Sequence, residues 1–184
     1  VLGGTGMSNT MKAFAGIESL RLKGKKVDGG YIVNGSLPWV SNLGEDHVFG
    51  TLFELEGSGG RSVMTLVDCQ MEGFTLRLSA HFTALEGTRT FACIFDNVFI
   101  PDAMIIDHDG AAFLRRSRAG IVLLQFGMGV GNIQSCIDLC REVEPLLGHV
   151  NCYLDDRPDE LQEELDDAVE AVLALAEDPF ETSE

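Results

Sequence analysis

Residues 30–42 read GYIVNGSLPWVSN and residues 90–101 read TFACIFDNVFIP, and these two stretches of the 184-residue chain are the most strand-like. Both are rich in β-branched and aromatic residues, and glycine, asparagine or proline residues bound them, which is typical of β-strands. Three shorter stretches between them repeat the pattern, separated by turn residues: 47–55, 62–67 and 74–78. Short strands at this spacing predict a small antiparallel β-barrel or sandwich.

The pattern differs on either side of these strands. Upstream, residues 17–22 (IESLRL) alternate apolar and polar side chains, which predicts one more half-buried strand. Downstream, apolar residues recur at helical spacing across residues 111–147, and Gly148 is expected to end this helix. A second helix is predicted to begin near Asp156, with Pro158 in its first turn.

Strands followed by long helices predict the α+β class, with a β-domain at residues 1–109 and antiparallel helices at residues 110–184. Two amphipathic helices cannot close a bundle, so their apolar faces need partners from elsewhere. The chain also begins with Val1 rather than methionine. These features predict a piece of a longer protein, without its N-terminal domain and the rest of its C-terminal domain.

Composition excludes several classes of function. The net charge is −16, and residues 155–184 hold thirteen acids and one basic residue, a net charge of −12. Such a surface repels phosphate backbones, so nucleic-acid binding is not expected. Five cysteines without a secretory signal fit a reducing, cytoplasmic setting. The most apolar stretch is interrupted by Gly120, Gln125 and three further glycines, so membrane contact is not expected either.

The two strand-like stretches resemble the acyl-CoA dehydrogenase family. Residues 30–42 are similar to that family's Gly-Tyr-x-Leu-Asn-Gly-x-Lys-x-Trp-Ile-Thr/Ser-Asn run. Residues 90–101 are similar to its Thr-x-x-Val-x-Phe-x-Asp-Val-x-Val-Pro strand, which leads into the C-terminal helices through a short glycine loop. The resemblance implies the family's middle β-domain at residues 1–109, followed by the start of its C-terminal helical domain.

The resemblance also implies an FAD site. In the family, the Trp-Ile-Thr/Ser run lies against the flavin ring, which here means Trp39, Val40 and Ser41. An indole offers a flat apolar surface, and a hydroxyl or backbone N–H can bond to flavin N5 or O4. From composition alone, Trp39 is better interpreted as a core residue and Ser41 as a turn residue, and the motif reverses this preference.

A glycine-rich stretch at residues 2–9, LGGTGMSN, corresponds to the family's Leu-Thr-Glu-Pro-Gly-x-Gly-Ser-Asp. The resemblance places Thr5 and Gly6 at the flavin and Ser8 at the flavin or the acyl-CoA. Glycines let backbone N–H groups approach a carbonyl or phosphate closely. The stretch is shorter than the family's and lacks the Glu-Pro pair, so a flexible chain end is the alternative.

The function implied for the complete protein is that of an FAD-dependent acyl-CoA dehydrogenase-like oxidoreductase, a homo-oligomer that dehydrogenates an acyl-CoA thioester at its α and β carbons. This reaction needs a carboxylate base for the α-proton. Some members of the family carry that base in the first C-terminal helix, where residues 114–118 of this chain read LRRSR and contain no carboxylate. No catalytic residue is therefore assigned, and it stays open whether this chain is an enzyme. The alternatives are a flavin-dependent monooxygenase on the same scaffold and a non-catalytic β-barrel interaction module.

Two further patterns do not predict sites. Residues 119–132, AGIVLLQFGMGVGN, imitate a dinucleotide-binding fingerprint, but Asn132 stands in place of the third glycine and no βαβ unit precedes it. The spacing of Cys136, Cys140, His149 and Cys152 fits none of the common zinc patterns, so no metal is expected.

Overall fold

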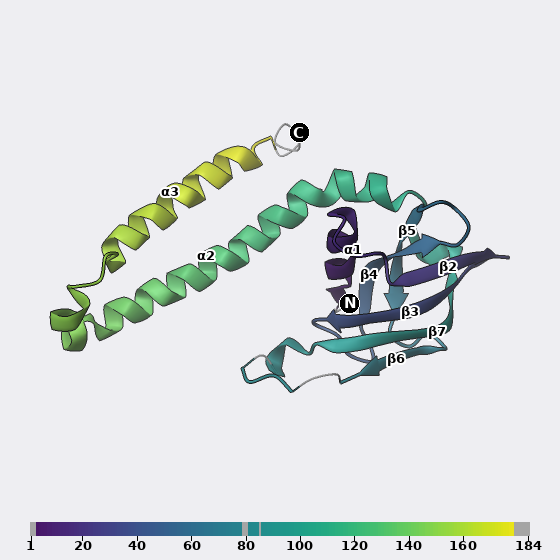
Figure 1. Ribbon diagram of the computed structural model, residues 1–184, viewed down its shortest axis with the longest axis horizontal. Helices are drawn as coiled ribbons and strands as arrows, with labels where there is room; N and C mark the ends of the chain where they lie inside the picture. The colour runs from purple at the N-terminus through teal and green to yellow at the C-terminus, as the bar shows by residue number, and fades with distance from the viewer. Residues whose placement is uncertain (1–2, 79–80, 85, 179–184) are drawn as a thin grey trace. The chain divides into compact units, whose positions relative to one another are not determined.

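The computed structural model describes residues 3–78, 81–84 and 86–178, which fold as two compact units, Val1–Leu114 and Arg115–Glu184. A mixed sheet and one short helix make up the first unit, and two long helices make up the second (Figure 1). Strands followed by long helices confirm the predicted α+β class.

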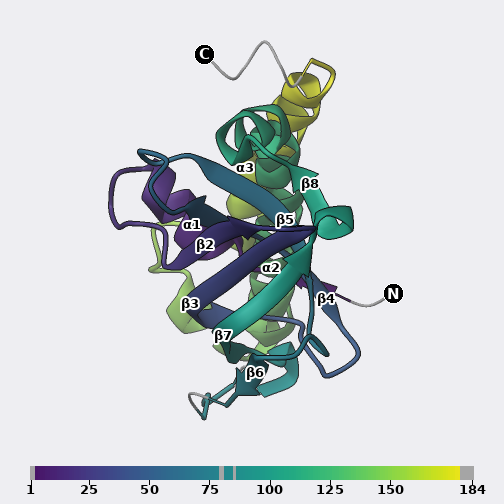
Figure 2. The same ribbon diagram turned by 90° about the vertical axis from the view of Figure 1, so that its right-hand side faces the viewer.

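Eight strands form the sheet, in the order β6-β7-β3-β2-β4-β5-β8, with β1 added on β4. Figure 2 shows β3 between β2 and β7. Most neighbours are antiparallel, but β4 pairs in parallel with both β1 and β2, so the sheet is mixed. The strands are β1 (Gly3–Thr5), β2 (Leu22–Val27), β3 (Gly30–Val40), β4 (Val48–Leu55), β5 (Ser62–Asp68), β6 (Phe74–Arg77), β7 (Phe91–Pro101) and β8 (Ile105–Asp107).

The two strand-like stretches of the sequence are direct neighbours. β3 and β7 pair antiparallel from Gly30↔Pro101 to Val40↔Phe91, with a register shift between Val33 and Gly35. At this irregularity the backbone N–H of Asn97 donates to Asn34 Oδ1 at 2.8 Å, and Asn97 has a φ of 53°. An asparagine tolerates this left-handed conformation better than most residues, so it suits the bulge.

The core of the first unit is apolar and partly aromatic. The rings of Phe49, Phe74 and Phe95 lie with centroids 5.1 to 6.4 Å apart, tilted or edge to face, as aromatic rings prefer. Burying each large apolar side chain stabilises the fold by about 1.5–3 kcal/mol. The largest fully buried side chains of the sheet and its turns are Phe49, Phe53, Leu22, Leu43, Leu52, Ile100, Val33, Val40, Val63, Val67 and Val98.

The expected strand at residues 17–22 is wrong over most of its length. β2 begins only at Leu22, and Ile17 is 72% exposed. The preceding residues connect β2 to α1 (Met7–Phe14), a helix that the sequence pattern did not indicate. An alternation of apolar and polar residues over so few positions also suits a loop, because a loop side chain need not enter the core.

The second helix of the chain, α2 (Gly110–Asn151), continues past its expected end. The N–H of Cys152 donates to the Gly148 carbonyl at 3.0 Å, so Gly148 lies inside the helix. Glycine in a helix interior costs about 1 kcal/mol relative to alanine but does not by itself end the helix. The next helix, α3 (Pro158–Ala176), has its proline in the first turn as predicted, with Arg157 as the capping residue.

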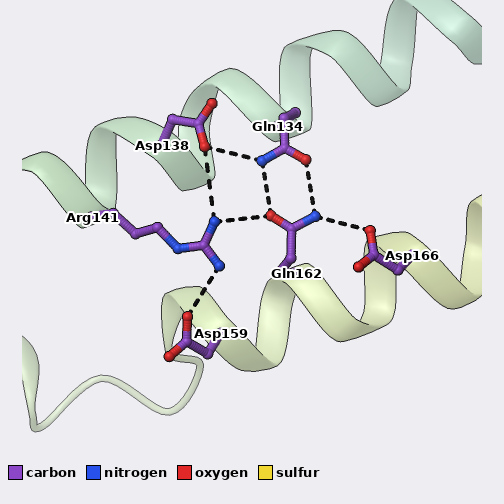
Figure 3. Close-up of polar contacts among 6 residues, drawn as sticks. All are labelled: Gln134, Asp138, Arg141, Asp159, Gln162 and Asp166. Atoms are coloured by element: carbon purple, nitrogen blue, oxygen red, sulfur yellow. Dashed lines mark hydrogen bonds and ion pairs between the residues drawn. The ribbon is translucent and has the colours of Figure 1, made fainter.

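A set of polar contacts joins α2 to α3 (Figure 3). Gln134 and Gln162 exchange two amide hydrogen bonds, of 2.8 and 2.9 Å. Arg141 donates to Gln162 Oε1 and to Asp159 Oδ1, each at 3.0 Å. Among the described residues of this unit, Ile137 is fully buried, and Leu165 on α3 is 6% exposed. The helix pair is therefore held by a polar network beside a small apolar contact.

Among the described residues, α2 is long and apolar enough to cross a membrane, with an 18-residue window of mean hydropathy 1.3 that is 6% buried. The glycines and Gln125 therefore do not keep this helix below the length and hydropathy of a membrane span, contrary to the expectation from the sequence. The core helix of a soluble protein meets the same criterion, because the criterion depends on length and composition alone. Large exposed apolar side chains on α2 are Val122, Leu124, Met128, Ile133, Leu139, Val143, Leu146, Leu147 and Val150.

Cysteine reactivity tests the burial pattern. Burial raises the pKa of the Cys93 thiol to about 12 and that of Cys69 to about 11, and the carboxylate of Asp68 adds to the shift at Cys69. The thiolate is the reactive form, so iodoacetamide at pH 8 is expected to modify the exposed cysteines of the helical unit first. Peptide mass spectrometry of the folded protein measures this order, and rapid modification of Cys93 would contradict the described core.

The amide pair between the helices is expected to show energetic coupling. In a double-mutant cycle of Gln134→Ala and Gln162→Ala, we expect a coupling energy of about 1 kcal/mol, since each substitution removes the same hydrogen bonds. Urea unfolding followed by helical circular dichroism measures it. The control cycle pairs Gln162→Ala with Gln125→Ala, an exposed glutamine elsewhere on α2, and is expected to give no coupling. Equal coupling in both cycles would mean that the contact contributes nothing specific.

Candidate functional site

The glycine-rich stretch near the N-terminus is folded against the sheet. Gly3 pairs with Val48 and Thr5 with Gly50, which places β1 parallel to β4. The side-chain amide of Asn42 donates to the Gly3 carbonyl at 2.6 Å. The first residue of the quoted motif, Leu2, lies outside the described residues. Residues 3–9 therefore adopt a defined structure beside the Trp-Val-Ser-Asn segment.

Two glycines permit this close packing. A Cβ added at Gly3 would lie 2.2 Å from the Val48 carbonyl oxygen. A Cβ added at Gly4 would lie 2.2 Å from the Ser41 carbonyl oxygen. No side chain fits at such distances, so only glycine lets β1 pass here. The close approach that the glycines allow is thus to carbonyls of the protein itself, and it brings β1 next to Ser41.

Gly6 connects β1 to α1 and is held on both sides. The Gly6 N–H donates to the Gly50 carbonyl at 2.7 Å, and the Thr51 hydroxyl donates to the Gly6 carbonyl at 3.3 Å. A Cβ at Gly6 would lie 3.0 Å from the side chains of Leu37 and Thr51. The start of α1 is thereby fixed against β3 and β4, and Ser8 is exposed in its first turn.

Asn9 fastens α1 to the loop that follows it, and sequence reasoning did not select it. Its side-chain amide donates to Glu18 Oε1 and to the Ser19 carbonyl, each at 3.0 Å, and its Oδ1 accepts from the Arg21 N–H at 2.9 Å. The hydrogen bond from Asn9, followed by that from Arg21, lowers the pKa of the Glu18 carboxyl. The sequence signal that could have pointed to Asn9 is its position directly after Ser8, at the end of the glycine-rich stretch 2–9.

Three of the six predicted site residues line one groove. Gly6 and Ser8 approach from the N-terminal stretch, and Trp39 approaches from the end of β3, about thirty residues later in the chain. The groove has a volume of about 100 Å3. Its remaining lining residues are Asn9, Lys12, Glu18, Arg21, Leu37 and Pro38.

Trp39 is not a core residue. It is 51% exposed, and its ring packs against Phe82 with centroids 5.9 Å apart. Half of a large apolar ring is therefore accessible to another molecule, and the interpretation of Trp39 as a core residue is excluded.

The other three predicted residues lie outside the lining of this groove. Val40 is 1% exposed and belongs to the core, so its side chain cannot touch a ligand. Thr5 is exposed at the end of β1. Ser41 is exposed just beyond β3, and its Oγ lies 2.6 Å from Oγ1 of Thr90.

The chemistry of these groups suits one side of a flavin. A half-exposed indole can cover an aromatic ring, and the hydroxyls of Ser8 and Ser41 can bond to its polar edge. Lys12 and Arg21 provide positive charge at the groove for phosphate groups, although Arg21 also pairs with Glu18 at 3.1 Å. Sites that enclose a ligand usually have about 300–1,000 Å3, so this groove by itself is too small to enclose a flavin.

No metal centre competes with this interpretation among the described residues, where no three His, Cys, Asp or Glu side chains are grouped to hold an ion. The carboxylate that lines the groove is that of Glu18, and Asn9 and Arg21 both donate to its oxygens.

Comparison with solved structures identifies the scaffold. Butyryl-CoA dehydrogenase from Megasphaera elsdenii aligns with 98% of this chain and 48% of its own, with a TM-score of 0.66 at 16% identity. A probable acyl-CoA dehydrogenase from Mycobacterium abscessus aligns with 95% of this chain and 49% of its own, with a TM-score of 0.67 at 17% identity. The fold is thus that of the middle and helical domains of acyl-CoA dehydrogenases.

Curated relatives agree with the fold. The mitochondrial isovaleryl-CoA dehydrogenase of Arabidopsis thaliana is 26% identical over 126 residues, which is 66% of this chain and 31% of that protein. Benzylmalonyl-CoA dehydrogenase of Aromatoleum aromaticum is 27% identical over 118 residues, 62% of this chain and 31% of that protein. No protein-family model matches. The resemblance read from the motifs is confirmed: over most of its length the chain is similar to acyl-CoA dehydrogenases, consistent with a partial member of that family.

The matched region is only part of these proteins. The chain spans about a third of the length of the curated relatives it matches, with 31% of each of the two named above covered. The activity, substrate and partners of the whole protein therefore belong to the proposals that follow.

The tight approach at Gly4 gives a direct test of the site's architecture. We expect Gly4→Ala to lower the free energy of unfolding by about 1–3 kcal/mol, because the new methyl group collides with the Ser41 carbonyl. Urea unfolding followed by Trp39 fluorescence reports on this unit. The control is Gly87→Ala, whose Cβ would meet nothing within 4 Å and which is expected to change stability by less than about 0.5 kcal/mol. Equal stability of the two variants would show that β1 is not packed as described.

Proposed function

We propose that this chain supplies one wall of an FAD site in an acyl-CoA dehydrogenase-like oxidoreductase. In the complete protein the reaction is the α,β-dehydrogenation of an acyl-CoA thioester. The observation that carries the proposal is the groove that brings Gly6 and Ser8 together with the half-exposed Trp39. Relatives that match 66% and 62% of the chain act on CoA thioesters according to their names, which supports the same chemistry.

FAD, when bound, supplies the acceptor for the hydride from the β-carbon. The chain's own residues bind and orient. Trp39 covers part of the ring, and the Ser41 hydroxyl bonds to its polar edge. Ser8, on the first turn of α1, is available to the flavin or to the acyl-CoA.

The proton from the α-carbon needs a base that this chain does not assign. Glu18 is the one carboxylate that lines the groove, and Asn9 and Arg21 both bind its oxygens. The lowered pKa of Glu18 makes it a weaker base than an ordinary glutamate. We therefore propose that the base, the rest of the FAD site and the remaining bundle helices come from other parts of the parent protein or its oligomer.

Two other functions remain as outcomes of the test. A flavin monooxygenase on this scaffold would also bind flavin, but the reduced protein would consume oxygen with its substrate. A non-catalytic interaction module would fold without binding flavin. A cytoplasmic location is a further proposal that follows from the free cysteines.

A flavin titration of the purified chain tests the proposal. FAD is expected to quench the fluorescence of the single tryptophan, Trp39, in a saturable way and to alter the flavin absorbance spectrum. Trp39→Ala is expected to weaken FAD binding about tenfold, because stacking on an aromatic side chain contributes about 1–3 kcal/mol per ring by analogy with bases. For this variant, flavin absorbance replaces tryptophan fluorescence as the readout.

Two controls sharpen the result. Trp39→Phe keeps an aromatic face and is expected to retain most of the affinity. Phe99→Ala removes another exposed ring, on β7, which is 45% exposed and does not line the groove, and is expected to leave FAD binding unchanged. A folded wild-type chain that shows no saturable quenching, or equal losses for Trp39→Ala and Phe99→Ala, would contradict the proposed site.

A further inference from the structure

A second aromatic ring supports the half-exposed indole of Trp39. Phe82 packs against it with ring centroids 5.9 Å apart and an interplanar angle of 56°. This separation and this tilt lie within the range that aromatic pairs prefer. Trp39 lines the groove of the candidate site, whereas Phe82 does not. Trp39 therefore joins Phe82 to the groove.

Phe82 is the least exposed residue of its own short segment, which lies between β6 and β7. His81, Thr83 and Ala84 are exposed, whereas Phe82 is half-buried. An apolar ring gains stability when another apolar surface covers it. The contact with Trp39 supplies such a cover, and in return it gives the indole a packed neighbour.

The end of this segment is fastened to the residues that follow Trp39. The N–H of Asn42 donates to the Thr88 carbonyl at 2.8 Å. The N–H of Leu43 donates to the Arg89 carbonyl at 3.2 Å. Arg89 has a φ of 49°, a left-handed conformation that a non-glycine residue keeps only where its surroundings hold it. The end of β3 therefore carries the indole and also holds the segment that brings the phenyl ring to it.

A packed neighbour matters for an exposed indole because such a side chain is otherwise free to rotate. Side chains occupy staggered rotamers, and contacts with neighbours select among them. Fixing one freely rotating side chain when a ligand binds raises the dissociation constant by a factor of about two to twelve. A neighbour that holds the ring before the ligand arrives removes this cost.

We infer that Phe82 is a positioning residue that holds the Trp39 indole in the orientation in which it covers the flavin ring. This inference rests on the proposed flavin site. Phe82 acts through Trp39 and does not itself touch the flavin, so the free chain already presents the indole at the groove. The residue lies outside stretches 30–42 and 90–101, which carry the family resemblance.

Two other roles for Phe82 give different expectations. If Phe82 only stabilised the fold, its loss would lower the stability of the unit and leave the FAD affinity of the folded chain unchanged. If Phe82 touched the flavin itself, its loss would weaken binding whether or not Trp39 is present. A residue that acts through Trp39 changes the mobility of the indole, and its effect on binding disappears when Trp39 is removed.

The mobility of the indole can be measured directly, because Trp39 is the single tryptophan of the chain. Phe82→Leu keeps an apolar side chain but removes the ring. We expect time-resolved fluorescence anisotropy of the FAD-free chain to show faster local rotation of Trp39 in this variant. Phe82→Tyr keeps an aromatic ring and is expected to behave like the wild type.

The FAD affinity of the full chain is measured by isothermal titration calorimetry, which does not depend on tryptophan. We expect Phe82→Leu to raise the dissociation constant about fivefold, the cost of fixing one side chain, and Phe82→Tyr to change it less than about twofold. In a Trp39→Ala background, Phe82→Leu is expected to change the dissociation constant less than about twofold, because the residue through which it acts is gone.

Phe99→Leu is the matched control. Phe99 lies on β7, is 45% exposed and does not line the groove, so this variant loses a ring of the same kind elsewhere on the sheet. It is expected to change neither the rotation of Trp39 nor the FAD affinity. Thermal unfolding of all variants separates loss of folding from loss of binding.

The outcomes separate the two proposals. If the folded wild-type chain does not bind FAD, the proposed flavin site is wrong and the role of Phe82 falls with it. If the wild type binds FAD and Phe82→Leu leaves the affinity unchanged, the flavin site stands and the role of Phe82 is wrong. A loss of affinity without faster rotation of the indole, or one that persists in the Trp39→Ala background, also overturns that role. Faster rotation together with a loss of affinity that disappears without Trp39 supports the inference.

Discussion

The antiparallel ladder between β3 and β7 is the constraint on which the rest of the first unit depends. It runs from Gly30↔Pro101 to Val40↔Phe91 and joins segments that are some sixty residues apart. On its inner side it contributes Val33, Val98 and Ile100 to the core, and at its end it sets Ser41 opposite Thr90. One set of backbone hydrogen bonds therefore positions both the apolar core and the polar edge of the candidate site.

The site itself is completed by a segment from outside that ladder. β1 reaches Ser41 because two glycines leave room for the carbonyls of Val48 and Ser41, and α1 then returns over the sheet with Asn9 bound to the following loop. The groove beside Trp39 exists only because these contacts hold α1 in place. In the proposed function this groove is one wall of a flavin site, and its groups bind and orient rather than transfer protons.

The helical unit leaves much of its apolar surface uncovered. α2 and α3 exchange a polar network around Gln134, Gln162 and Arg141, yet most large apolar side chains of α2 are exposed. A helix pair gains most of its stability from covering such faces, so a polar network beside one small apolar contact is a weak substitute. The acidic side chains of α3 are exposed and do not cover the apolar surface.

By itself the sequence determined the α+β class, five of the eight strands, both long helices and the family resemblance, because strand and helix periodicity and turn residues are local properties. It also selected Gly6, Ser8 and Trp39, which the folded chain brings to one groove. Local pattern could not show that Ile17–Arg21 is a loop, that Gly148 lies within a helix or that Val40 faces the core. Nor could it show Asn9 or Phe82, since their roles depend on which residues they contact. Register, burial and hydrogen-bond partners are set by contacts between distant segments, and only the tertiary structure decided them.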